Sequence, residues 1–574
     1  MNNLLLLLAY IPPLLSIFGR KLGYVGVIAI SVILAYYSLT NFTSVASYFG
    51  LLSSLVWILI STFSLFNRKD TLLEVAITLS IAGMITVLEA DEYLIFLVGW
   101  EVMSIPIYYY LGKRGNFGSA FVFISFSEVS TVLLLSAFLV ANESSFMVLL
   151  SPIPLMLATV GFLIKMGVIP FTAAEWLPIA QGNAPSTLSA LVSSTITLMG
   201  VYGILKLSIL TQTIPLYFPL ILLVLGSMTV FFGALYAYVS ESIKGSLAFS
   251  TAENNGAIVA ALSVYMFAKS LNMTQIEHIS FFSVLFYAFA HSIAKTGLFL
   301  ATSLQDSTAF SFTKKFRGGL YTLGLSLATS SMSGLLPNLG GVASWLLLEL
   351  LFILAYLLHN MLSVLFIVSG FTVAMGEGFA TALMLKLISY INLFRNNGKC
   401  EKRVSSTIFV PGLMVLLLGI IMPHLIYPYE TSLTSLGMFC LIVTQYQGRV
   451  FGGISPLYVF MLIVVLSGIT YVVFGRPKVR RVNVWNNGVR DQEEYTAFAL
   501  SNNVRLMLRK ILKHESVYVN TDSTDIFWTL ILRLGRNLRK IGKVFGRSFV
   551  NSSIQWYILY MVLTLIALII LLSL

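Results

Sequence analysis

The sequence predicts an all-α polytopic membrane protein of about 16 transmembrane helices, two of them interrupted, with a lateral amphipathic helix toward the C-terminal end. Three observations support this fold class. Of 574 residues, 57% are hydrophobic and only 10% are charged, and the mean hydropathy is +0.90. Apolar stretches that can cross a hydrocarbon core of about 30 Å recur along the chain. Basic residues gather in alternate connections between these stretches. This composition excludes a soluble fold of this length.

The predicted spans follow one another with short connections. They cover residues 3–18, 23–39, 45–66, 71–89, 93–111, 118–140, 153–179, 184–207, 214–240, 244–268, 280–304, 320–357, 363–391, 406–424, 455–474 and 554–573. The opening Met-Asn-Asn and its leucine run lack a basic segment and a cleavage pattern, so we interpret them as the first helix rather than a signal peptide.

Basic residues test this count independently, because lysine and arginine accumulate in short cytoplasmic loops. They follow spans one, three, five, nine, eleven, thirteen and fifteen, as Arg20 and Lys21, Arg68 and Lys69, Lys113 and Arg114, Lys244, Lys314, Lys315 and Arg317, Arg395, Lys399, Lys402 and Arg403, and Arg476, Lys478, Arg480 and Arg481. Odd-numbered spans are therefore expected to end in the cytoplasm, with both termini outside.

Two predicted spans are longer than a simple crossing and contain helix breakers. Pro170 lies in 153–179, and Pro337, Gly340 and Gly341 lie in 320–357. The alternation holds only if each stretch counts once, as an interrupted helix. The apolar stretch at 433–445 is too short to span a bilayer and is expected to be interfacial or re-entrant.

The formal net charge of +12 lies in the predicted cytoplasmic loops and in the polar region after span fifteen, so it does not indicate nucleic-acid binding. The two cysteines, Cys400 and Cys440, are too few for an iron–sulfur cluster or a disulfide framework. No His/Cys cluster has zinc spacing. We therefore expect no metal and no cofactor in this chain.

A polar segment separates the last two predicted spans. Its second half, from Asp525 to Arg547, places Ile526, Leu530, Leu534, Leu538 and Ile541 near one face and Arg533, Arg536, Arg539 and Lys540 largely on another. This periodicity predicts an amphipathic interfacial helix. It would either rest on anionic lipid headgroups or brace partner subunits before the chain re-enters the membrane.

These features divide the chain into five regions. We expect N-terminal transmembrane helices at 1–66, a transport core at 67–424, a last core span with the re-entrant or interfacial piece at 425–475, a cytoplasmic-side polar segment with the lateral helix at 476–553, and a C-terminal transmembrane anchor at 554–574.

Ionisable residues interrupt the apolar spans and are the strongest functional signal. They are Glu101, Glu128, Lys165, Glu253, His291, Lys295, Glu349 and Lys386. A charge at mid-membrane costs about 3 kcal/mol on insertion scales, so such groups usually line a water-filled path or pair with one another. Together they predict a polar axis for ion or proton movement.

The run from Lys165 through Pro170-Phe-Thr-Ala-Ala-Glu-Trp-Leu-Pro to Gly200-Val-Tyr-Gly203 resembles the signature of antiporter-like proton-translocating subunits. That family occurs in respiratory complex I, in Mrp-type Na⁺/H⁺ antiporters and in membrane-bound energy-converting hydrogenases. Further similar motifs are Gly99-Trp-Glu-Val-Met-Ser-Ile-Pro106, Leu247-Ala-Phe-Ser-Thr251 and His291-Ser-Ile-Ala-Lys295. The segment Val484-Trp-Asn-Asn-Gly488 is more similar to the hydrogenase-type members.

The resemblance implies roles for individual residues. Glu101 and Lys165 match a pair in which the approach of the carboxylate controls proton binding by the lysine, although a structural ion pair is the alternative. Lys295 matches the central-axis lysine, and His291 lies one helical turn before it on the same face. Histidine exchanges protons near neutral pH, which favours a relay. Pro170 and Pro337 would free backbone carbonyls and admit water at mid-membrane.

The sequence also departs from the family. On span eight the expected basic relay residue is missing, and Ser193 and Ser194 offer only hydroxyls. On span twelve the expected terminal lysine or glutamate falls near Ser344 or Trp345. Glu349, one turn further, or Lys386 on span thirteen would substitute as the exit group, or each would form a buried ion pair.

No family role is assigned to Glu128 or to the supporting residue Glu253, for which a structural role is the simpler interpretation. We expect a proton- or sodium/proton-translocating subunit of a respiratory complex, of the NADH:quinone dehydrogenase or energy-converting hydrogenase type, in a prokaryotic plasma membrane. Its partners would be other membrane subunits and the lipid bilayer, and the chain itself would carry no catalytic site. The alternatives are a degenerate subunit acting as a scaffold or conformational coupler, and a stand-alone cation/proton antiporter.

Overall fold

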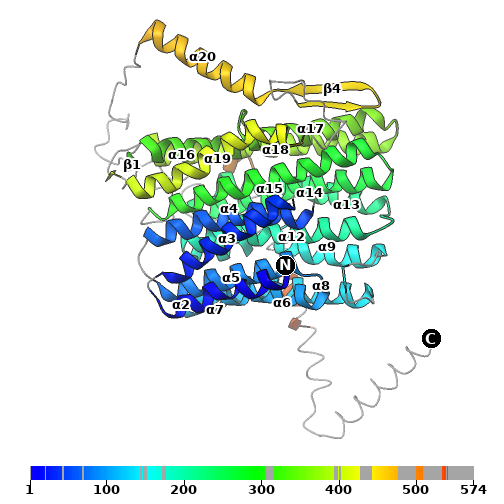
Figure 1. Cartoon of the computed structure of the whole chain (residues 1–574). Helices are drawn as coiled ribbons and strands as arrows, with labels where there is room; N and C mark the ends of the chain where they lie inside the picture. Colours follow the sequence, from blue (N-terminus) through cyan, green and yellow to red (C-terminus); the bar gives the residue numbers. More distant parts are fainter. Residues whose placement is uncertain are drawn as a thin grey trace, which may run out of the picture.

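The computed structural model describes residues 2–19, 21–41, 44–66, 70–141, 145–146, 151–170, 176–304, 310, 316–317, 319–393, 398–399, 402–426, 442–475, 500–508, 533–537 and 539–540. Within these ranges the chain is a bundle of helices that lie side by side (Figure 1). Helices α14 and α15 lie in the middle of the bundle, with the N-terminal helices on one flank and α16–α19 on the opposite flank (Figure 1). The all-α polytopic prediction is confirmed.

Among the described residues, thirteen helical segments precede α13. They are α1 (Asn2–Ala9), α2 (Ile11–Ile17), α3 (Leu22–Thr40), α4 (Val45–Phe66), α5 (Thr71–Glu89), α6 (Tyr93–Val102), α7 (Ile105–Lys113), α8 (Phe117–Ala141), α9 (Pro152–Met166), α10 (Trp176–Asn183), α11 (Ser186–Leu191), the π-helix η1 (Val192–Ile196) and α12 (Thr197–Leu210).

The rest of the described chain adds longer helices and two small sheets. These elements are α13 (Tyr217–Val239), α14 (Ile243–Ser270), α15 (Thr274–Thr302), β1 (Phe316–Arg317), α16 (Gly319–Met332), α17 (Leu339–Leu357), α18 (Met361–Ile388), the π-helix η3 (Ser389–Leu393), β2 (Gly398–Lys399), α19 (Lys402–Ile426), β3 (Ile442–Tyr446), β4 (Arg449–Ile454), α20 (Pro456–Phe474) and α21 (Asn502–Met507).

Twelve helices of the described residues are long and apolar enough to cross a membrane, so the predicted count of 16 is not established. Two further predicted spans, 3–18 and 153–179, contain the shorter apolar helices Leu4–Ile17 and Pro152–Met166. The span predicted at 244–268 is the 28-residue helix α14, which is buried along most of its length and carries Glu253, Asn254 and Asn255. The span predicted at 554–573 lies outside the described residues.

The predicted alternation of loop sides is confirmed by contacts between the loops. The connections that follow the odd-numbered spans from one to thirteen each meet another connection of this set, through the pairs Lys21–Leu65, Asp70–Arg114, Asn116–Asn183, Ala184–Lys244, Glu241–Phe310 and Arg317–Lys399. The even-numbered connections meet in the same way, as in Lys206–Ala90, Lys269–Ser208 and Gln447–Gln275. The connections that follow odd-numbered spans therefore lie together at one end of the bundle, which is the predicted cytoplasmic end.

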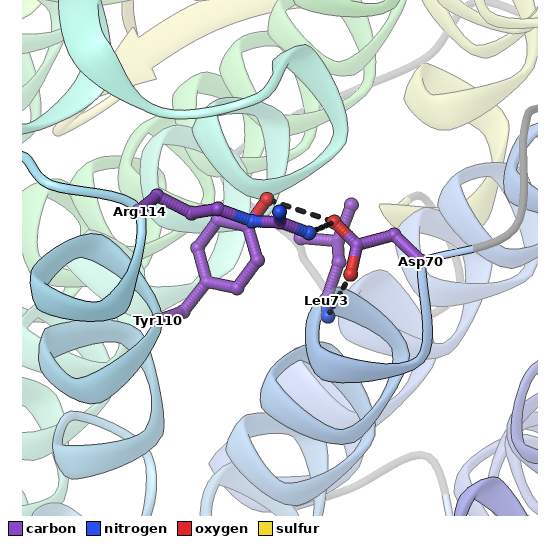
Figure 2. A network of polar contacts seen from close by, with 4 residues as sticks. All are labelled: Asp70, Leu73, Tyr110 and Arg114. Carbon is purple, nitrogen blue, oxygen red and sulfur yellow. Dashed lines mark hydrogen bonds and ion pairs between the residues drawn. The ribbon is translucent and has the colours of Figure 1, made fainter.

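Asp70 joins two of these connections and begins a helix. Its Oδ1 accepts a hydrogen bond from the Leu73 backbone N–H at 3.2 Å, which caps the N-terminus of α5. Its Oδ2 accepts from the Tyr110 hydroxyl at 3.1 Å and pairs with Arg114 at the end of α7 (Figure 2). One carboxylate thus fixes the start of α5 relative to the end of α7.

Both predicted interruptions are present. The span with Pro170 is divided into α9 and α10, and the span with Pro337 into α16 and α17. The Ile169–Pro170 and Leu336–Pro337 peptide bonds are cis. The sequence analysis missed a third interruption, at Met103 and Ser104 between α6 and α7, where Pro106 lies in the first turn of α7.

Glycine residues let the central helices approach closely. An added Cβ at Gly256 of α14 would lie 2.7 Å from the Val230 backbone nitrogen and 2.8 Å from the Gly226 carbonyl oxygen, both on α13. Small residues at such crossings let membrane helices pack backbone against backbone. This packing positions α14, which carries several polar side chains, beside α13 and α15.

The stretch predicted as interfacial or re-entrant at 433–445 ends in a strand. Residues from Ile442 onward form β3, which pairs antiparallel with β4, while 427–441 lie outside the described residues. Gln447 and Gly448 have φ of 48° and 80°, as a two-residue type I′ hairpin turn requires. The β-branched run Ile442-Val443-Thr444 favours the strand.

The predicted lateral helix lies mostly outside the described residues. Residues 533–537 and 539–540 are helical, and Ile526, Leu530, Leu538 and Ile541 are not described, so the bracing role of this segment stays a prediction. Helix α20 precedes this region and leaves the bundle (Figure 1). Among its residues only Pro456 is buried by the described part of the chain.

Candidate functional site

A row of buried polar side chains crosses the middle of the bundle from α6–α9 to α17–α18. It contains Lys165, Ser193, Ser194, Glu253, His291 and Lys295, each at most 2% exposed. These residues come from four different segments, α9, η1, α14 and α15, so tertiary packing rather than local sequence brings them together. We call this row the polar axis.

Lys165 begins the axis in the last turn of α9, directly before the interruption. Its Nζ donates to Ser104 Oγ at 2.6 Å and to Ser127 Oγ at 2.9 Å. The Trp100 and Phe123 rings lie 5.7 and 5.4 Å from Nζ, within cation–π range. Ser104 lies at the unpredicted α6/α7 interruption, which therefore helps to bind this lysine.

Glu101 lies one turn before Ser104 and is partly buried. It accepts a hydrogen bond from the Thr131 hydroxyl of α8 and makes no ion pair with Lys165. Glu128 of α8 is exposed on the flank of the bundle and interacts with Glu101. In this conformation the predicted pair is apart, with the serine hydroxyls bound to the ammonium.

Ser193 and Ser194 lie in the π-helix η1, which the sequence analysis did not predict. Ser193 Oγ is 2.7 Å from Thr251 Oγ1 of α14. Thr296 of α15 donates to Ser194 Oγ at 2.9 Å, and Ser292 donates to the Ser194 carbonyl oxygen at 2.6 Å. π-Helical turns are frequent at functional sites. Here the turn connects α14 and α15 through hydroxyl groups.

His291 and Lys295 occupy the same face of α15, as predicted, and both are fully buried. His291 Nε2 lies 3.1 Å from the Ser193 carbonyl oxygen. Lys295 Nζ donates to the Leu247 carbonyl oxygen of α14 at 2.8 Å. The structure therefore brings Ser193, His291 and Lys295 together between η1, α14 and α15.

Glu253 completes the centre of the axis. Its Oε2 accepts from Ser250 Oγ and from Asn254 Nδ2, both at 2.9 Å. It is close enough to Lys295 and Glu377 to interact electrostatically with both. The next residue but one, Asn255, donates to the Met166 carbonyl oxygen at 2.6 Å and so links α14 to the interruption after Lys165. Glu253 is more central than the sequence analysis assumed.

Glu377 of α18 and Tyr287 of α15 are functional candidates that the sequence analysis missed. Tyr287 donates to Glu377 Oε1 at 3.0 Å, and Ser344 donates to the same oxygen at 2.9 Å. Glu377 is a charge in an apolar span, so the criterion that selected Lys386 in the same helix also applies to it. A carboxylate of α18 thus lies beside Ser344, the α17 position at which the sequence has no ionisable residue.

The two predicted substitute exit groups lie in different places. Glu349 Oε1 accepts from Thr444 of the β3–β4 hairpin at 3.2 Å, at the end of the bundle opposite the basic loops. Lys386 is fully buried and donates to the carbonyl oxygens of Tyr238 and Ser240 at 3.0 and 2.9 Å. These carbonyls lie at the predicted cytoplasmic end, so Lys386 is far from any outward exit.

Several buried polar atoms along the axis have no hydrogen-bond partner among the described residues. They include both amide atoms of Gln181 on α10, Oδ1 of Asn255 and Nδ1 of His291. Buried polar groups of this kind are normally satisfied by internal water. No three His, Cys, Asp or Glu side chains of the described ranges gather as metal ligands. The unpartnered atoms of Gln181, Asn255 and His291 are hydrogen-bonding groups of the kind that internal water satisfies.

Comparison with protein families agrees with this geometry. Residues 90–376, half of the chain, match the family described as "NADH:quinone oxidoreductase/Mrp antiporter, TM". The chain belongs to this family. The matched range contains Glu101, Lys165, His291, Lys295 and Glu349, whereas Glu377 lies one residue beyond it.

Curated relatives of this antiporter-family chain include subunits of hydrogenases and quinone oxidoreductases. Hydrogenase-4 component B of Escherichia coli (strain K12) is 29% identical over 54% of this chain and 51% of its own length. Formate hydrogenlyase subunit 3 of the same strain is 31% identical over 34% of this chain and 33% of its own length. NAD(P)H-quinone oxidoreductase chain 4 2 of Thermosynechococcus vestitus (strain NIES-2133 / IAM M-273 / BP-1) is 28% identical over 45% of this chain and 52% of its own length. The chain thus matches about half or less of their length.

Solved structures share the antiporter-family fold over more of the chain. A chain of the archaeal membrane-bound sulfane sulfur reductase superposes with a TM-score of 0.75, covering 98% of this chain and 99% of that one at 16% identity. A chain of the Mrp complex of Dietzia sp. DQ12-45-1b superposes with a TM-score of 0.62, covering 74% of this chain and 95% of that one at 15% identity. A chain of respiratory complex I of Thermus thermophilus superposes with a TM-score of 0.58, covering 75% of this chain and 99% of that one at 18% identity. All three are membrane complexes, so membrane partner subunits are consistent with this fold.

Proposed function

We propose that this chain is a proton-translocating, antiporter-like subunit of a multi-subunit respiratory complex in a prokaryotic plasma membrane. The observation that supports it best is the series of buried polar residues from Lys165 to Lys295. Chemistry with the electron donor and acceptor would belong to partner subunits, and this chain would contribute the proton path.

The path that we propose begins at the predicted cytoplasmic end. Protons reach Lys165 through the interrupted helix at Pro170, then pass along Asn255, the hydroxyls of Ser193 and Thr251, and His291 to Lys295. Internal water would bridge the gaps beside the unpartnered atoms of Gln181 and Asn255.

The inward step depends on Glu101. When this carboxylate approaches Lys165 it favours the ammonium form, and when it withdraws toward Thr131 the lysine releases its proton more readily. The observed contacts of Lys165 with two serine hydroxyls correspond to the withdrawn position. A conformational change in a partner subunit would move the carboxylate.

We assign the outward leg to Glu349 rather than Lys386, because Lys386 lies at the predicted cytoplasmic end. The interruption at Pro337 lies between Lys295 and this exit and would admit water from the opposite side. The lateral amphipathic helix that the periodicity predicts would, in this proposal, brace neighbouring subunits.

The test is proton translocation in inverted membrane vesicles that carry the complete complex. Lys295→Met is expected to abolish the pH gradient while the complex still assembles, because the central carrier is lost. Lys269→Met is the matched control, since Lys269 binds the Ser208 carbonyl oxygen at the far end of α14, away from the axis. It should keep the gradient.

A full gradient in Lys295→Met would reject proton conduction by this chain and leave the scaffold function. A gradient that requires added sodium in the wild type would identify sodium/proton exchange. A purified chain that carries no partner subunits would favour the stand-alone antiporter instead.

A further inference from the structure

Glu377 occupies a built site at the junction of four helical segments. Its Oε1 accepts hydrogen bonds from Tyr287 of α15 and Ser344 of α17, and these two hydroxyls also lie 3.1 Å from each other. An added Cβ on Gly334, in the interruption between α16 and α17, would lie 3.1 Å from Oε2. A carboxylate with two aligned hydroxyl donors at mid-span is therefore placed directly against a helix break.

The position of this site relates it to the axis. Glu253 interacts with Lys295 on one side and Glu377 on the other. On α15, Tyr287 precedes Lys295 by eight residues, about 12 Å at 1.5 Å per residue, in the direction away from the predicted cytoplasmic end. Glu377 thus lies beyond Lys295 on the outward side of the axis.

Apolar surroundings make a structural role costly. Glu377 is the one acidic residue of α18, which is otherwise apolar apart from hydroxyls and Lys386. A carboxylate at this depth costs several kcal/mol to insert unless it is hydrogen-bonded or protonated. No ion pair involving Glu377 is present among the described residues. Hydroxyl donors that bind the carboxylate, with no fixed cation, suit a group that gains and loses a proton.

We propose that Glu377 is the proton carrier between Lys295 and the outward exit at Glu349, supplied by α18 in place of an ionisable residue at Ser344 on α17. In the transfer, the Lys295 ammonium becomes a neutral amine and, by way of Glu253, the Glu377 carboxylate becomes a carboxylic acid. The acid then releases its proton to water along the α16/α17 interruption and returns to the carboxylate. Tyr287 and Ser344 are positioning residues that orient the carboxylate.

This inference rests on the proposed function and is tested in the same vesicles. Glu377→Gln preserves the side-chain shape and the two hydroxyl contacts but cannot bind a proton, so assembly and electron transfer should persist while the pH gradient is lost. Glu277→Gln is the matched control. Glu277 lies in the first turn of α15, ten residues before Tyr287, and its variant should keep the gradient. Glu377→Asp provides a second variant that retains the carboxylate and is expected to keep part of it.

A rescue variant separates proton transfer from structure. Ser344 on α17 lies 2.9 Å from the Glu377 carboxylate. The double variant Ser344→Glu/Glu377→Gln therefore places the carboxyl group on α17 instead of α18, at a neighbouring position. Restoration of the gradient in this double variant is the expected result. A gradient lost in Glu377→Gln and not restored by the double variant would overturn the proposal in favour of a structural role.

The outcome for Lys295→Met distinguishes failure of the Glu377 proposal from failure of the proposed function. If Lys295→Met loses the gradient and Glu377→Gln keeps it fully, the proposal that Glu377 carries the proton is overturned and the proposed function stands. If both variants keep the gradient, the proposed function itself fails.

Discussion

Individual residues of the axis were predictable where a charge interrupts an apolar span. Lys165, His291 and Lys295 are all fully buried, as their positions in the sequence required. Their partners were not predictable, because Ser104 and Ser127 are separated from Lys165 by 61 and 38 residues and are common in membrane helices. Glu377 could have been found by the same charge criterion, but its link to Ser344 depends on the packing of α17 against α18.

Ser127 and Ser130 of α8 allow a matched test of the Lys165 contacts. Ser127 accepts from Lys165, whereas Ser130, one turn further and also buried, donates to the Gly161 carbonyl oxygen of α9. A hydrogen bond to a charged group contributes about 1.5–3 kcal/mol, roughly twice that of a neutral bond. Ser127→Ala should therefore slow proton translocation, and Ser130→Ala should leave the rate near that of the wild type.

Initial rates of gradient formation at equal electron-transfer rates would measure this difference. Equal rates in the two variants would mean that the serine contact does not help to hold the proton on Lys165. Thermal unfolding of the purified complex would report whether either change acts through stability alone.

At the scale of elements, the sequence predicted the interruptions at Pro170 and Pro337, because proline removes a backbone donor and breaks the helix. It did not predict η1, since one extra residue in a helical turn leaves no compositional signal. The β3–β4 hairpin was missed for a different reason: a short apolar run suits a buried strand as well as a helix. The amphipathic helix at 525–547 remains untested.

Close packing of α13 against α14 makes a prediction at this scale. Gly256→Ala would place a methyl group 2.7 Å from the Val230 backbone nitrogen, and overpacking of this kind typically costs about 1–3 kcal/mol. Gly378→Ala is the control, because an added Cβ on this α18 glycine meets nothing within 4 Å. It should be neutral or stabilising by up to about 1 kcal/mol through helix propensity.

Melting temperatures of the two variants in detergent would decide this point. Gly256→Ala should melt below the wild type and Gly378→Ala at or above it. An unchanged melting temperature for Gly256→Ala would show that α13 and α14 separate easily, and the axis would then not be held by this crossing.

For the whole molecule, the alternation of basic loops predicted the topology, and the loop contacts from Lys21 to Lys399 agree with it. The sequence could not predict that the polar axis lies between two partly buried carboxylates, Glu101 on one flank and Glu377 on the opposite flank. That arrangement depends on the order in which the helices pack, which hydropathy does not encode. It brings carboxylates that are 276 residues apart in the sequence to the two sides of one row of polar side chains.

The central claim is that this path carries protons in step with electron transfer. The most direct measurement is the number of protons translocated per electron in vesicles with the intact complex, compared between the wild type and Lys165→Met. We predict a lower ratio, or complete loss of the gradient, in Lys165→Met. An unchanged ratio would contradict the account and leave this chain as a scaffold.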